Sequence, residues 1–130
     1  MKMILLCEDE PDIQRTLKNI LKKRGYEVRT AKDGEEAINI AKKINPDAIL
    51  LDIRMPKVDG LEVAREVRKC NTQTKIIFIT AFQSPELSKE AAKYNISDYL
   101  VKPASPGKIL KAVEDALRAR VVPANPQPTA

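Results

Sequence analysis

The stretch Ala48-Ile49-Leu50-Leu51-Asp52-Ile53-Arg54-Met55-Pro56 decides how the rest of the sequence is interpreted. An apolar run leads to a single carboxylate at Asp52, and turn-forming residues follow at Met55-Pro56 and at Asp59-Gly60. A short apolar run bounded by turn formers is typical of a strand that is buried on both faces. Asp52 is therefore expected where a buried strand meets water, and in an open parallel sheet ligands bind at that edge.

The composition is that of one globular domain, with 130 residues of which 43% are hydrophobic and 32% charged. Basic residues outnumber acidic ones by 23 to 18, but they are scattered along the predicted helices, which favours a solvated surface over a nucleic-acid site. The chain has no histidine and its two cysteines lack metal-ligand spacing, which excludes a zinc site and a histidine-based triad. We find no signal peptide or membrane-spanning stretch and expect a cytoplasmic protein without a membrane partner.

Strand and helix patterns alternate along the chain. Short apolar or alternating runs predict strands, and stretches with an apolar face at helical spacing lie between them. Pro11, Asp33, Ser84-Pro85 and Ser105-Pro106 mark helix starts, whereas Asp59-Gly60 is interpreted as a turn. The predicted strands are 3–6, 26–30, 48–52, 76–79 and 97–101. Five strands alternating with five helices predict right-handed crossovers and an α/β fold with a doubly wound parallel sheet.

Four of the predicted strands end in residues that can do chemistry. These residues are Glu8 with Asp9, Asp52, Thr80 and Lys102. Parallel strands deliver all of them to one edge of the sheet. In the flavodoxin-like strand order 2-1-3-4-5 the first and third strands are neighbours, so three carboxylates converge there. Such a cluster repels itself unless a cation joins it, and hard oxygen ligands favour Mg²⁺.

This set of residues is suited to phosphoryl transfer. A carboxylate can attack phosphorus and form an aspartyl-phosphate, and Asp52 is our nucleophile because it ends the central strand. Glu8 and Asp9 are better placed as metal ligands. The metal and Lys102 would balance the charge on the transferring oxygens, and the Thr80 hydroxyl could bond one of them.

Short motifs stand in a fixed order at or just after the ends of the predicted strands. They are Glu8-Asp9, Leu50-Leu51-Asp52, Met55-Pro56 with Asp59-Gly60, Thr80-Ala81 and Lys102-Pro103. Each motif alone is weakly specific, but together they are highly specific. From Lys2 to about Arg120 the sequence resembles a response-regulator receiver domain of two-component signalling, similar to the chemotaxis messengers. The resemblance predicts a receiver domain over residues 1–120 and a proline-rich C-terminal tail over 121–130.

The resemblance implies a phosphorylation site and a metal site. Asp52 would be the phosphoacceptor and would take a phosphoryl group from a sensor histidine kinase or a phosphotransfer protein. Asp9, Asp52 and the backbone carbonyl of Arg54 would ligate Mg²⁺, with Glu8 acting mainly through a bound water. The acidic pair departs from the commoner Asp-Asp form of the family, but Glu8 keeps the charge.

The resemblance also implies a switch. Thr80 and Tyr99 would form the switch pair, with the hydroxyl moving towards the phosphoryl group while the ring turns inward. The surface of the fourth helix, fifth strand and fifth helix would change as a result and signal to a downstream protein. A cis peptide bond between Lys102 and Pro103 would aim the lysine into the site. Ala104 stands where the family usually has Phe, which bears on the partner that this surface fits.

Two other functions remain as alternatives. A phosphatase of the haloacid-dehalogenase type also forms an aspartyl-phosphate, but it needs a second Asp two residues after the nucleophile, where this chain has Arg54. A receiver-like binding module would keep the fold and never be phosphorylated. We favour a signalling switch that catalyses only its own phosphorylation and slow self-dephosphorylation. It would be a single-domain regulator or the receiver part of a longer one, monomeric or dimeric on phosphorylation, without direct contact to nucleic acid.

Overall fold

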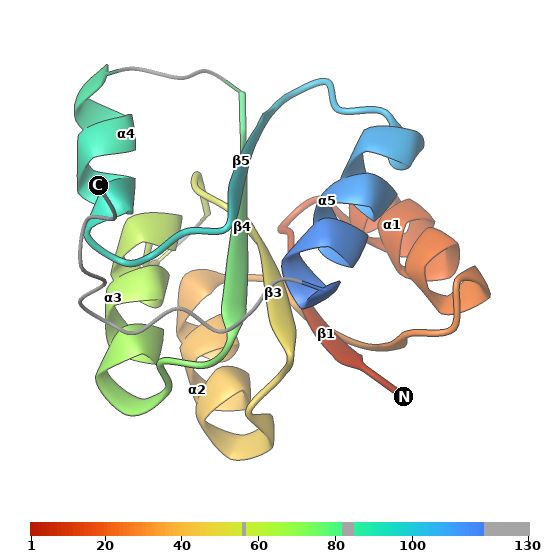
Figure 1. Cartoon of the computed structure of the whole chain (residues 1–130), viewed down its shortest axis with the longest axis horizontal. Helices are drawn as coiled ribbons and strands as arrows, with labels where there is room; N and C mark the ends of the chain where they lie inside the picture. The colour runs from red at the N-terminus through yellow and green to blue at the C-terminus, as the bar shows by residue number, and fades with distance from the viewer. Residues whose placement is uncertain (56, 82–84, 119–130) are drawn as a thin grey trace.

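The computed structural model describes residues 1–55, 57–81 and 85–118. Five parallel strands form one sheet in the order β2-β1-β3-β4-β5 (Figure 1). The strands are β1 (Met3–Cys7), β2 (Glu27–Ala31), β3 (Ala48–Asp52), β4 (Lys75–Thr80) and β5 (Asp98–Val101). Each predicted strand is therefore correct to within one residue at either end. The order confirms the predicted flavodoxin-like, doubly wound α/β fold.

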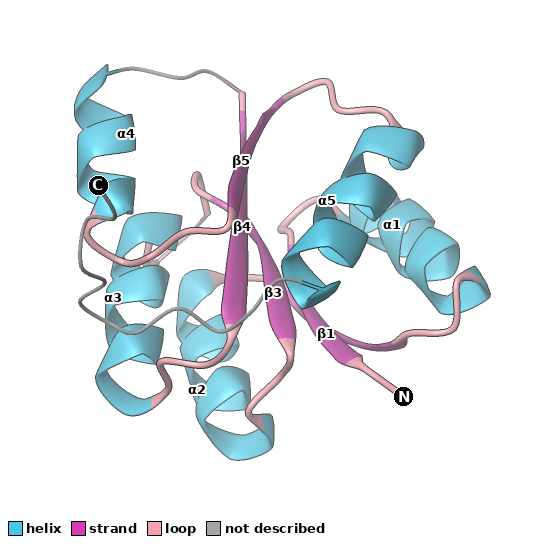
Figure 2. Ribbon diagram, viewed as in Figure 1, coloured by secondary structure: helices cyan, strands magenta, loops and turns pink. Residues whose placement is uncertain are grey.

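Helices cover both faces of the sheet, as right-handed crossovers between parallel strands require. They are α1 (Pro11–Lys23), α2 (Gly34–Ile44), α3 (Gly60–Cys70), α4 (Pro85–Ala92) and α5 (Pro106–Arg118). Helices α1 and α5 lie on one face, and α2, α3 and α4 lie on the other (Figure 2). No helix in the described part of the chain is long and apolar enough to cross a membrane.

The central strand β3 is buried along its whole length, as its apolar run predicted. Ile49 and Leu51 face the core beneath α2 and α3, and this core also holds Val63 and Phe78. Leu50 points to the opposite face and packs in the core beneath α1 and α5. The two cores on either side of one strand explain why β3 shows no polar alternation before it reaches Asp52.

Local signals place several helix starts correctly. The Asp33 side chain accepts a hydrogen bond from the backbone N–H of Glu36 at 2.8 Å, as its spacing predicted. Ser105 Oγ likewise accepts from the N–H of Lys108 at 3.2 Å. The predicted cap at Ser84 lies outside the described residues, as does the predicted tail at 121–130.

The interpretation of Asp59-Gly60 as a turn was incomplete. Asp59 is the N-cap of α3 and accepts a hydrogen bond from the N–H of Glu62 at 3.0 Å, and Gly60 is the first residue of that helix. The sequence Asp-Gly is equally typical of a turn and of a capped helix start, so the pair alone does not distinguish them.

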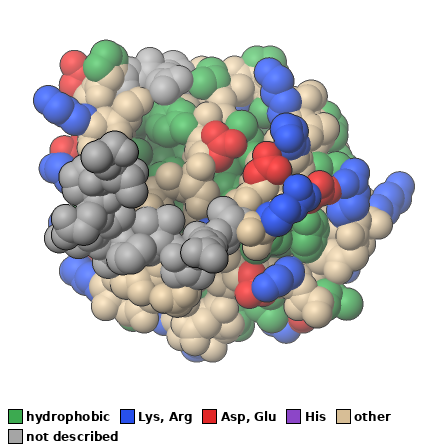
Figure 3. Space-filling model, viewed as in Figure 1, with side chains coloured by type: hydrophobic (Ala, Val, Ile, Leu, Met, Phe, Trp, Pro, Cys, Tyr) green, Lys and Arg blue, Asp and Glu red, His purple; other side chains and the backbone are tan. Residues whose placement is uncertain are grey.

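Charged side chains are mixed on the surface. On the face shown in Figure 3, most Lys and Arg side chains of the described residues lie towards the margin, Asp and Glu side chains lie among them and near the middle, and the two kinds are mixed. Nucleic-acid-binding proteins gather basic residues into a stripe or patch. This face therefore has the scattered charge distribution that the sequence predicted.

Candidate phosphoacceptor and metal site

The strand register brings the predicted site residues to one edge of the sheet. Asp52, the last residue of β3, lies opposite Ile79 of β4, and Thr80 at the end of β4 lies opposite Val101 of β5. The backbone N–H of Lys102 donates to the Thr80 carbonyl at 2.6 Å, so the residue after β5 is held against the end of β4. Parallel pairing thus gathers residues that are far apart in the sequence.

Three carboxylates meet at this edge. Glu8, Asp9 and Asp52 each offer an oxygen, and these oxygens lie within 4.8 Å of one another. Glu8 and Asp52 are buried, with 3% and 6% of their surface exposed, whereas Asp9 is exposed. Carboxylates at this distance repel one another, and a small divalent cation relieves that repulsion. The all-oxygen donor set at the mouth of the site fits Mg²⁺, which binds a few carboxylates and keeps several waters.

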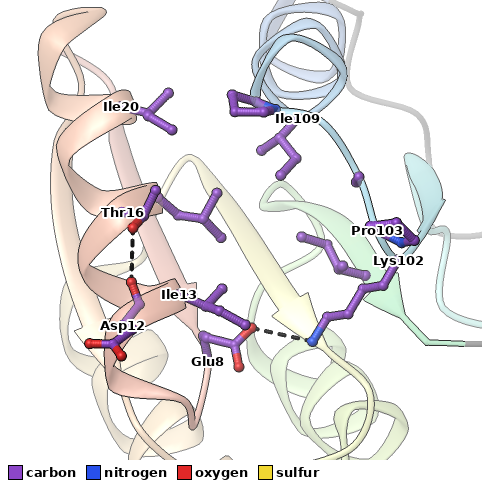
Figure 4. Close-up of a pocket in the computed structure, with 12 residues that line it drawn as sticks. Glu8, Asp12, Ile13, Thr16, Ile20, Lys102, Pro103 and Ile109 are labelled. Atoms are coloured by element: carbon purple, nitrogen blue, oxygen red, sulfur yellow. Dashed lines mark hydrogen bonds and ion pairs between the residues drawn. The ribbon is translucent and has the colours of Figure 1, made fainter.

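Lys102 supplies positive charge at the acidic cluster. Its Nζ lies 2.7 Å from Asp52 Oδ2 and 3.5 Å from Glu8 Oε1. Figure 4 shows the lysine side chain extended towards Glu8. Burial alone would lower the pKa of Lys102, but the ion pairs with Asp52 and Glu8 outweigh it and raise the pKa. Lys102 is therefore held in its charged form against the cluster.

The pKa of Glu8 is raised as well, which for a carboxyl group disfavours the charged form. Burial raises the pKa of its carboxyl group and the charge of Asp52 adds to the rise, against the Glu10 N–H and Lys102, which lower it. Loss of hydration on burial is the main cause of the raised pKa, and at this edge one lysine faces three carboxylates. The site is thus suited to receive further positive charge.

Both carboxylate oxygens of Asp52 are oriented by the protein. Oδ2 faces Lys102, and Oδ1 accepts a hydrogen bond from the backbone N–H of Arg54 at 3.0 Å. Ile53 N–H donates to the Ile79 carbonyl at 3.1 Å, which continues the β3–β4 ladder just past Asp52. The start of the loop after β3 therefore fixes the Asp52 side chain, and it places Arg54 beside the acidic cluster.

The predicted switch residues lie at different depths. Thr80 is 1% exposed and lines a cavity of about 760 Å³ together with Asp9 and Arg54. Tyr99 is only partly buried, and its ring packs edge-on against Phe78 with centroids 6.1 Å apart and planes at 88°. The Tyr99 hydroxyl is buried and has no hydrogen-bond partner among the described residues, and burial raises its pKa.

The peptide bond between Lys102 and Pro103 is cis, as the resemblance implied. The structure brings Glu8, Asp9, Asp52, Thr80 and Lys102 to one edge, and Tyr99 packs, partly buried, against the core beneath α2 and α3.

A groove between α1 and α5 was not predicted. It has a volume of about 600 Å³ and opens at Glu8 and Lys102. Figure 4 shows Ile13 and Ile20 of α1 on one side and Ile109 of α5 on the other. The apolar spacing on both helices predicts a buried face, but periodicity cannot distinguish a filled core from a groove between two helices. Ala104, noted as a departure from the family, lines this groove.

Comparisons with known proteins agree with this geometry. The family described as the response regulator receiver domain matches residues 4–114. The chemotaxis protein CheY of Thermotoga maritima is 34% identical over 113 residues, which are 86% of this chain and 94% of that protein. The regulatory protein AtoC of Escherichia coli is 34% identical over 115 residues, 88% of this chain but 25% of that protein. The chain spans about half the length, or less, of several curated relatives that it matches.

Solved structures give the same result. The chemotaxis protein CheY4 of Vibrio cholerae has a TM-score of 0.83 and 34% identity, and the match covers 89% of this chain and 98% of that one. The response regulator TrrA of Thermotoga maritima, solved in complex with Mg²⁺ and BeF, has a TM-score of 0.79 and 38% identity over 89% of this chain and 99% of that one.

Fold, acidic cluster and comparisons lead to one assignment. Receiver domains bind Mg²⁺, and this chain has the carboxylates to do so. Membership also implies a histidine kinase as partner. The chain belongs to the response-regulator receiver domains of two-component signalling, CheY-like signalling modules rather than enzymes.

Proposed function

We propose that this protein is a phosphorylation-activated receiver that takes a phosphoryl group on Asp52 from a histidine kinase or a phosphotransfer protein. The observation that carries the proposal is the set of contacts around the Asp52 carboxylate. It is buried, it is held by Lys102 Nζ and the Arg54 N–H, and it shares its edge with two further carboxylates. A nucleophile fixed in this way is prepared for transfer without reorganisation of the site.

The transfer follows from the chemistry of the groups present. An oxygen of Asp52 forms the bond to phosphorus while the bond from phosphorus to the donor's imidazole nitrogen breaks, and that nitrogen leaves with its electron pair. Lys102 then pairs with a phosphoryl oxygen in addition to the carboxylates it contacts now. The Thr80 hydroxyl bonds a second phosphoryl oxygen. Stabilising charge on the transferring oxygens is most of what this reaction requires.

Asp9, Asp52 and the backbone carbonyl of Arg54 would hold Mg²⁺, with Glu8 acting through a water. When bound, the ion neutralises charge that develops on the phosphoryl oxygens. The position of Arg54, two residues after Asp52, also argues against a phosphatase, since a guanidinium cannot serve as the general acid and base there. Slow hydrolysis of the acyl phosphate by water remains expected.

The groove between α1 and α5 supports a protein donor. A phosphohistidine must reach Asp52 from outside, and the groove opens at Glu8 and Lys102, next to Asp52. Its lining is mainly apolar, with Ile13, Leu17 and Ile109 among the residues. An amphipathic helix of the donor that carries the phosphohistidine would place its apolar residues here.

Output would pass through Thr80 and Tyr99 to the face formed by α4, β5 and α5, and from there to a downstream protein target. Val101 at the end of β5 is 43% exposed, and besides Met1 it is the one large hydrophobic residue that the described chain exposes. We propose a cytoplasmic receiver over residues 1–120, monomeric or dimeric on phosphorylation. It is a single-domain regulator, or a part of a longer regulator.

The direct test is intact-mass spectrometry after incubation with acetyl phosphate, with and without Mg²⁺. We expect a single labile phosphoryl adduct that requires both Mg²⁺ and Asp52, so Asp52→Asn abolishes it. Asp59→Asn is the matched control, because Asn keeps the N-cap of α3 and the residue lies outside the acidic cluster.

Three outcomes would contradict the proposal. No adduct on folded wild-type protein favours the binding module that is never phosphorylated. An adduct that persists in Asp52→Asn places the acceptor elsewhere. Rapid multiple turnover of acetyl phosphate favours the phosphatase.

A further inference from the structure

The loop between β3 and α3 is held from outside by the start of α2. The described residues of this loop are Ile53–Met55 and Lys57–Asp59, and it includes Arg54, whose N–H orients Asp52. Helices α2 and α3 pack side by side on the same face of the sheet (Figure 1). The first residue of α2, Gly34, is buried where the two meet.

The peptide group of Val58 fills the space that a side chain on Gly34 would need. A Cβ built on Gly34 would lie 1.9 Å from the Val58 carbonyl oxygen and 2.7 Å from the carbonyl carbon. No real Cβ approaches a backbone atom so closely, so either α2 or the loop would have to move. Gly34 is therefore the residue that permits α2 and the loop to touch.

Conformation does not explain the glycine. Gly34 is not among the residues with positive φ, so its backbone is one that any residue adopts. In a helix, alanine is favoured over glycine by about 1 kcal/mol, so helix propensity opposes glycine here. The steric contact with Val58 is the remaining physical reason for glycine at this position.

The residue before Gly34 contacts the same loop. Asp33 is 5% exposed, and its Oδ2 lies 3.6 Å from Nζ of Lys57, the residue preceding Val58. Lys57 has φ of 69°, a left-handed conformation that a non-glycine residue seldom adopts. Two successive residues of α2's start thus contact two successive residues of the loop.

The far end of the loop closes back on Asp52. The N–H of Gly60 donates to the Ile53 carbonyl at 2.7 Å. A Cβ on Gly60 would lie 2.7 Å from Ile53 Cα and 2.9 Å from the Asp52 carbonyl oxygen. The loop is therefore pinned at its base by Gly60 and on its outer side by Gly34, and Arg54 lies between the two contacts.

We propose that Gly34 is a positioning residue for the phosphoacceptor site. By leaving room for the Val58 peptide, it allows α2 to hold the loop where the Arg54 N–H meets Asp52 and where the Arg54 carbonyl is the proposed Mg²⁺ ligand. The inference rests on the proposed function for the role of that carbonyl. Residues that orient metal ligands from behind commonly change metal affinity by about 10- to 100-fold when they are replaced.

The test compares Gly34→Ala with Gly107→Ala. Gly107 lies in the first turn of α5, and a Cβ there would have no atom within 4 Å, so it is a matched replacement of a helical glycine without a contact. We expect Gly34→Ala to weaken Mg²⁺ binding roughly tenfold, measured by titration calorimetry at a temperature where the variant is folded. Phosphorylation by acetyl phosphate at a fixed, subsaturating Mg²⁺ concentration should slow accordingly, and Gly107→Ala should change neither quantity.

Lys57→Ala provides a second variant in case Gly34→Ala does not fold. The Lys57 side chain is exposed, so its removal leaves the core intact. Loss of a positive charge near the site would by itself tighten Mg²⁺ binding. The positioning role predicts the opposite, a weaker affinity, because the link between Asp33 and the loop is lost.

The outcomes separate the two proposals. If folded Gly34→Ala binds Mg²⁺ within twofold of the wild-type affinity, the positioning role is overturned. If only Lys57→Ala folds, unchanged or tighter Mg²⁺ binding by that variant overturns it. If wild-type protein takes no phosphoryl group, the proposed function fails. The Mg²⁺ titration still tests Gly34 in that case.

Discussion

Buried polar groups at the two edges of the sheet differ in how fully other groups of the protein pair with them. At the carboxyl edge, where the strands end, three carboxylates share one lysine. At the opposite edge, where the strands begin, the partly buried guanidinium of Arg68 donates four hydrogen bonds, all of them to backbone carbonyls. The acceptors are the backbone carbonyls of Tyr94, Asn71, Thr74 and Asn95.

At the opposite edge, the buried polar groups named here form hydrogen bonds with other groups of the chain. Arg68 ties the end of α3 to the segments that lead into β4 and β5, and burial lowers its pKa. Thr74 Oγ1 donates to the Pro46 carbonyl at 2.8 Å, and Asp47 accepts from the N–H of Met3 at 2.7 Å. Polar groups paired in this way contribute to stability and leave little for a ligand to bind.

The comparison explains where function lies in this fold. Both edges contain buried polar atoms, but among the described residues only the carboxyl edge gathers several carboxylates around a single lysine. An imbalance of this kind destabilises the chain by itself and is relieved by a cation. The predictions below test whether one edge serves binding and the other stability, and they run from the largest expected effect to the smallest.

Replacing Lys102 should have the largest effect. We expect Lys102→Met to slow phosphorylation by acetyl phosphate by about 10²- to 10³-fold, because a charge that stabilises the transferring oxygens is lost. The rate of adduct formation in Mg²⁺ measures this. Lys108→Met is a control on an exposed lysine at the start of α5. A rate close to wild type in Lys102→Met would remove Lys102 from the site.

Replacing Arg68 should affect stability and not phosphorylation. We expect Arg68→Met to lower the free energy of unfolding by about 3 kcal/mol, because its backbone acceptors lose a charged donor. Urea denaturation measures the loss. Arg65→Met on the same helix is the control, since Arg65 is exposed and pairs with Glu62 on the surface, and it should lose little.

The separation of stability at one edge from binding at the other would be contradicted if Arg68→Met, still folded at low temperature, no longer formed the Asp52 adduct. In that case the opposite edge would also act on the site.

Mg²⁺ should stabilise the chain through the acidic cluster. At a concentration 100-fold above its dissociation constant, an ion that binds only the folded state adds about 2.7 kcal/mol to the free energy of unfolding. Thermal denaturation with and without Mg²⁺ measures the effect. Asp9→Asn should reduce it and, without Mg²⁺, should be at least as stable as wild type because a like charge is removed.

Asp12→Asn is the control for Asp9, because Asp12 is an exposed acid near the site that pairs with Arg15. Equal Mg²⁺ stabilisation in wild type and Asp9→Asn would exclude Asp9 as a ligand.

The smallest effect is expected at Tyr99. Its hydroxyl is buried without a hydrogen-bond partner among the described residues, so Tyr99→Phe removes an unsatisfied group. We expect a change in the free energy of unfolding of less than about 1 kcal/mol, neutral or stabilising. Urea denaturation is the measurement. A clear loss of stability would mean that the hydroxyl has a partner.

The Tyr99 result also bears on the proposed switch. The Tyr99 ring packs against Phe78, and a phenylalanine ring at position 99 can make the same contact. We therefore expect Tyr99→Phe to keep the ring position seen here. Comparison of ring chemical shifts with and without phosphorylation would show whether the ring moves. A ring that does not move would exclude the switch role.

Local sequence patterns were sufficient for most of the fold. The apolar run at Ala48–Leu51, buried on both faces, identified the central strand, and capping residues such as Asp33 and Ser105 marked helix starts. These signals act over a few residues, through hydrogen bonds and side-chain periodicity within one element. The Asp59-Gly60 pair shows the limit, because the same two residues suit a turn and a capped helix.

The candidate site was predictable because the carboxyl ends of parallel strands all lie at one edge of the sheet. Once strands one and three were placed side by side, Glu8, Asp9 and Asp52 had to converge, and the register bears this out. The ion pair between Lys102 and Asp52 follows from the same topology. The α1–α5 groove could not be predicted, because the same apolar stripe on a helix fits a filled core as well as an open groove.

The sequence by itself determined the strands, the helices and the residues that meet at the carboxyl edge, because each depends on nearby residues or on the direction of a parallel strand. Only the tertiary structure decided the contacts of Gly34 with Val58 and of Arg68 with its backbone carbonyls. In both cases the partner is a backbone atom. Every residue type carries the same backbone, so no sequence pattern marks the partner, and the contact arises only when distant segments pack together.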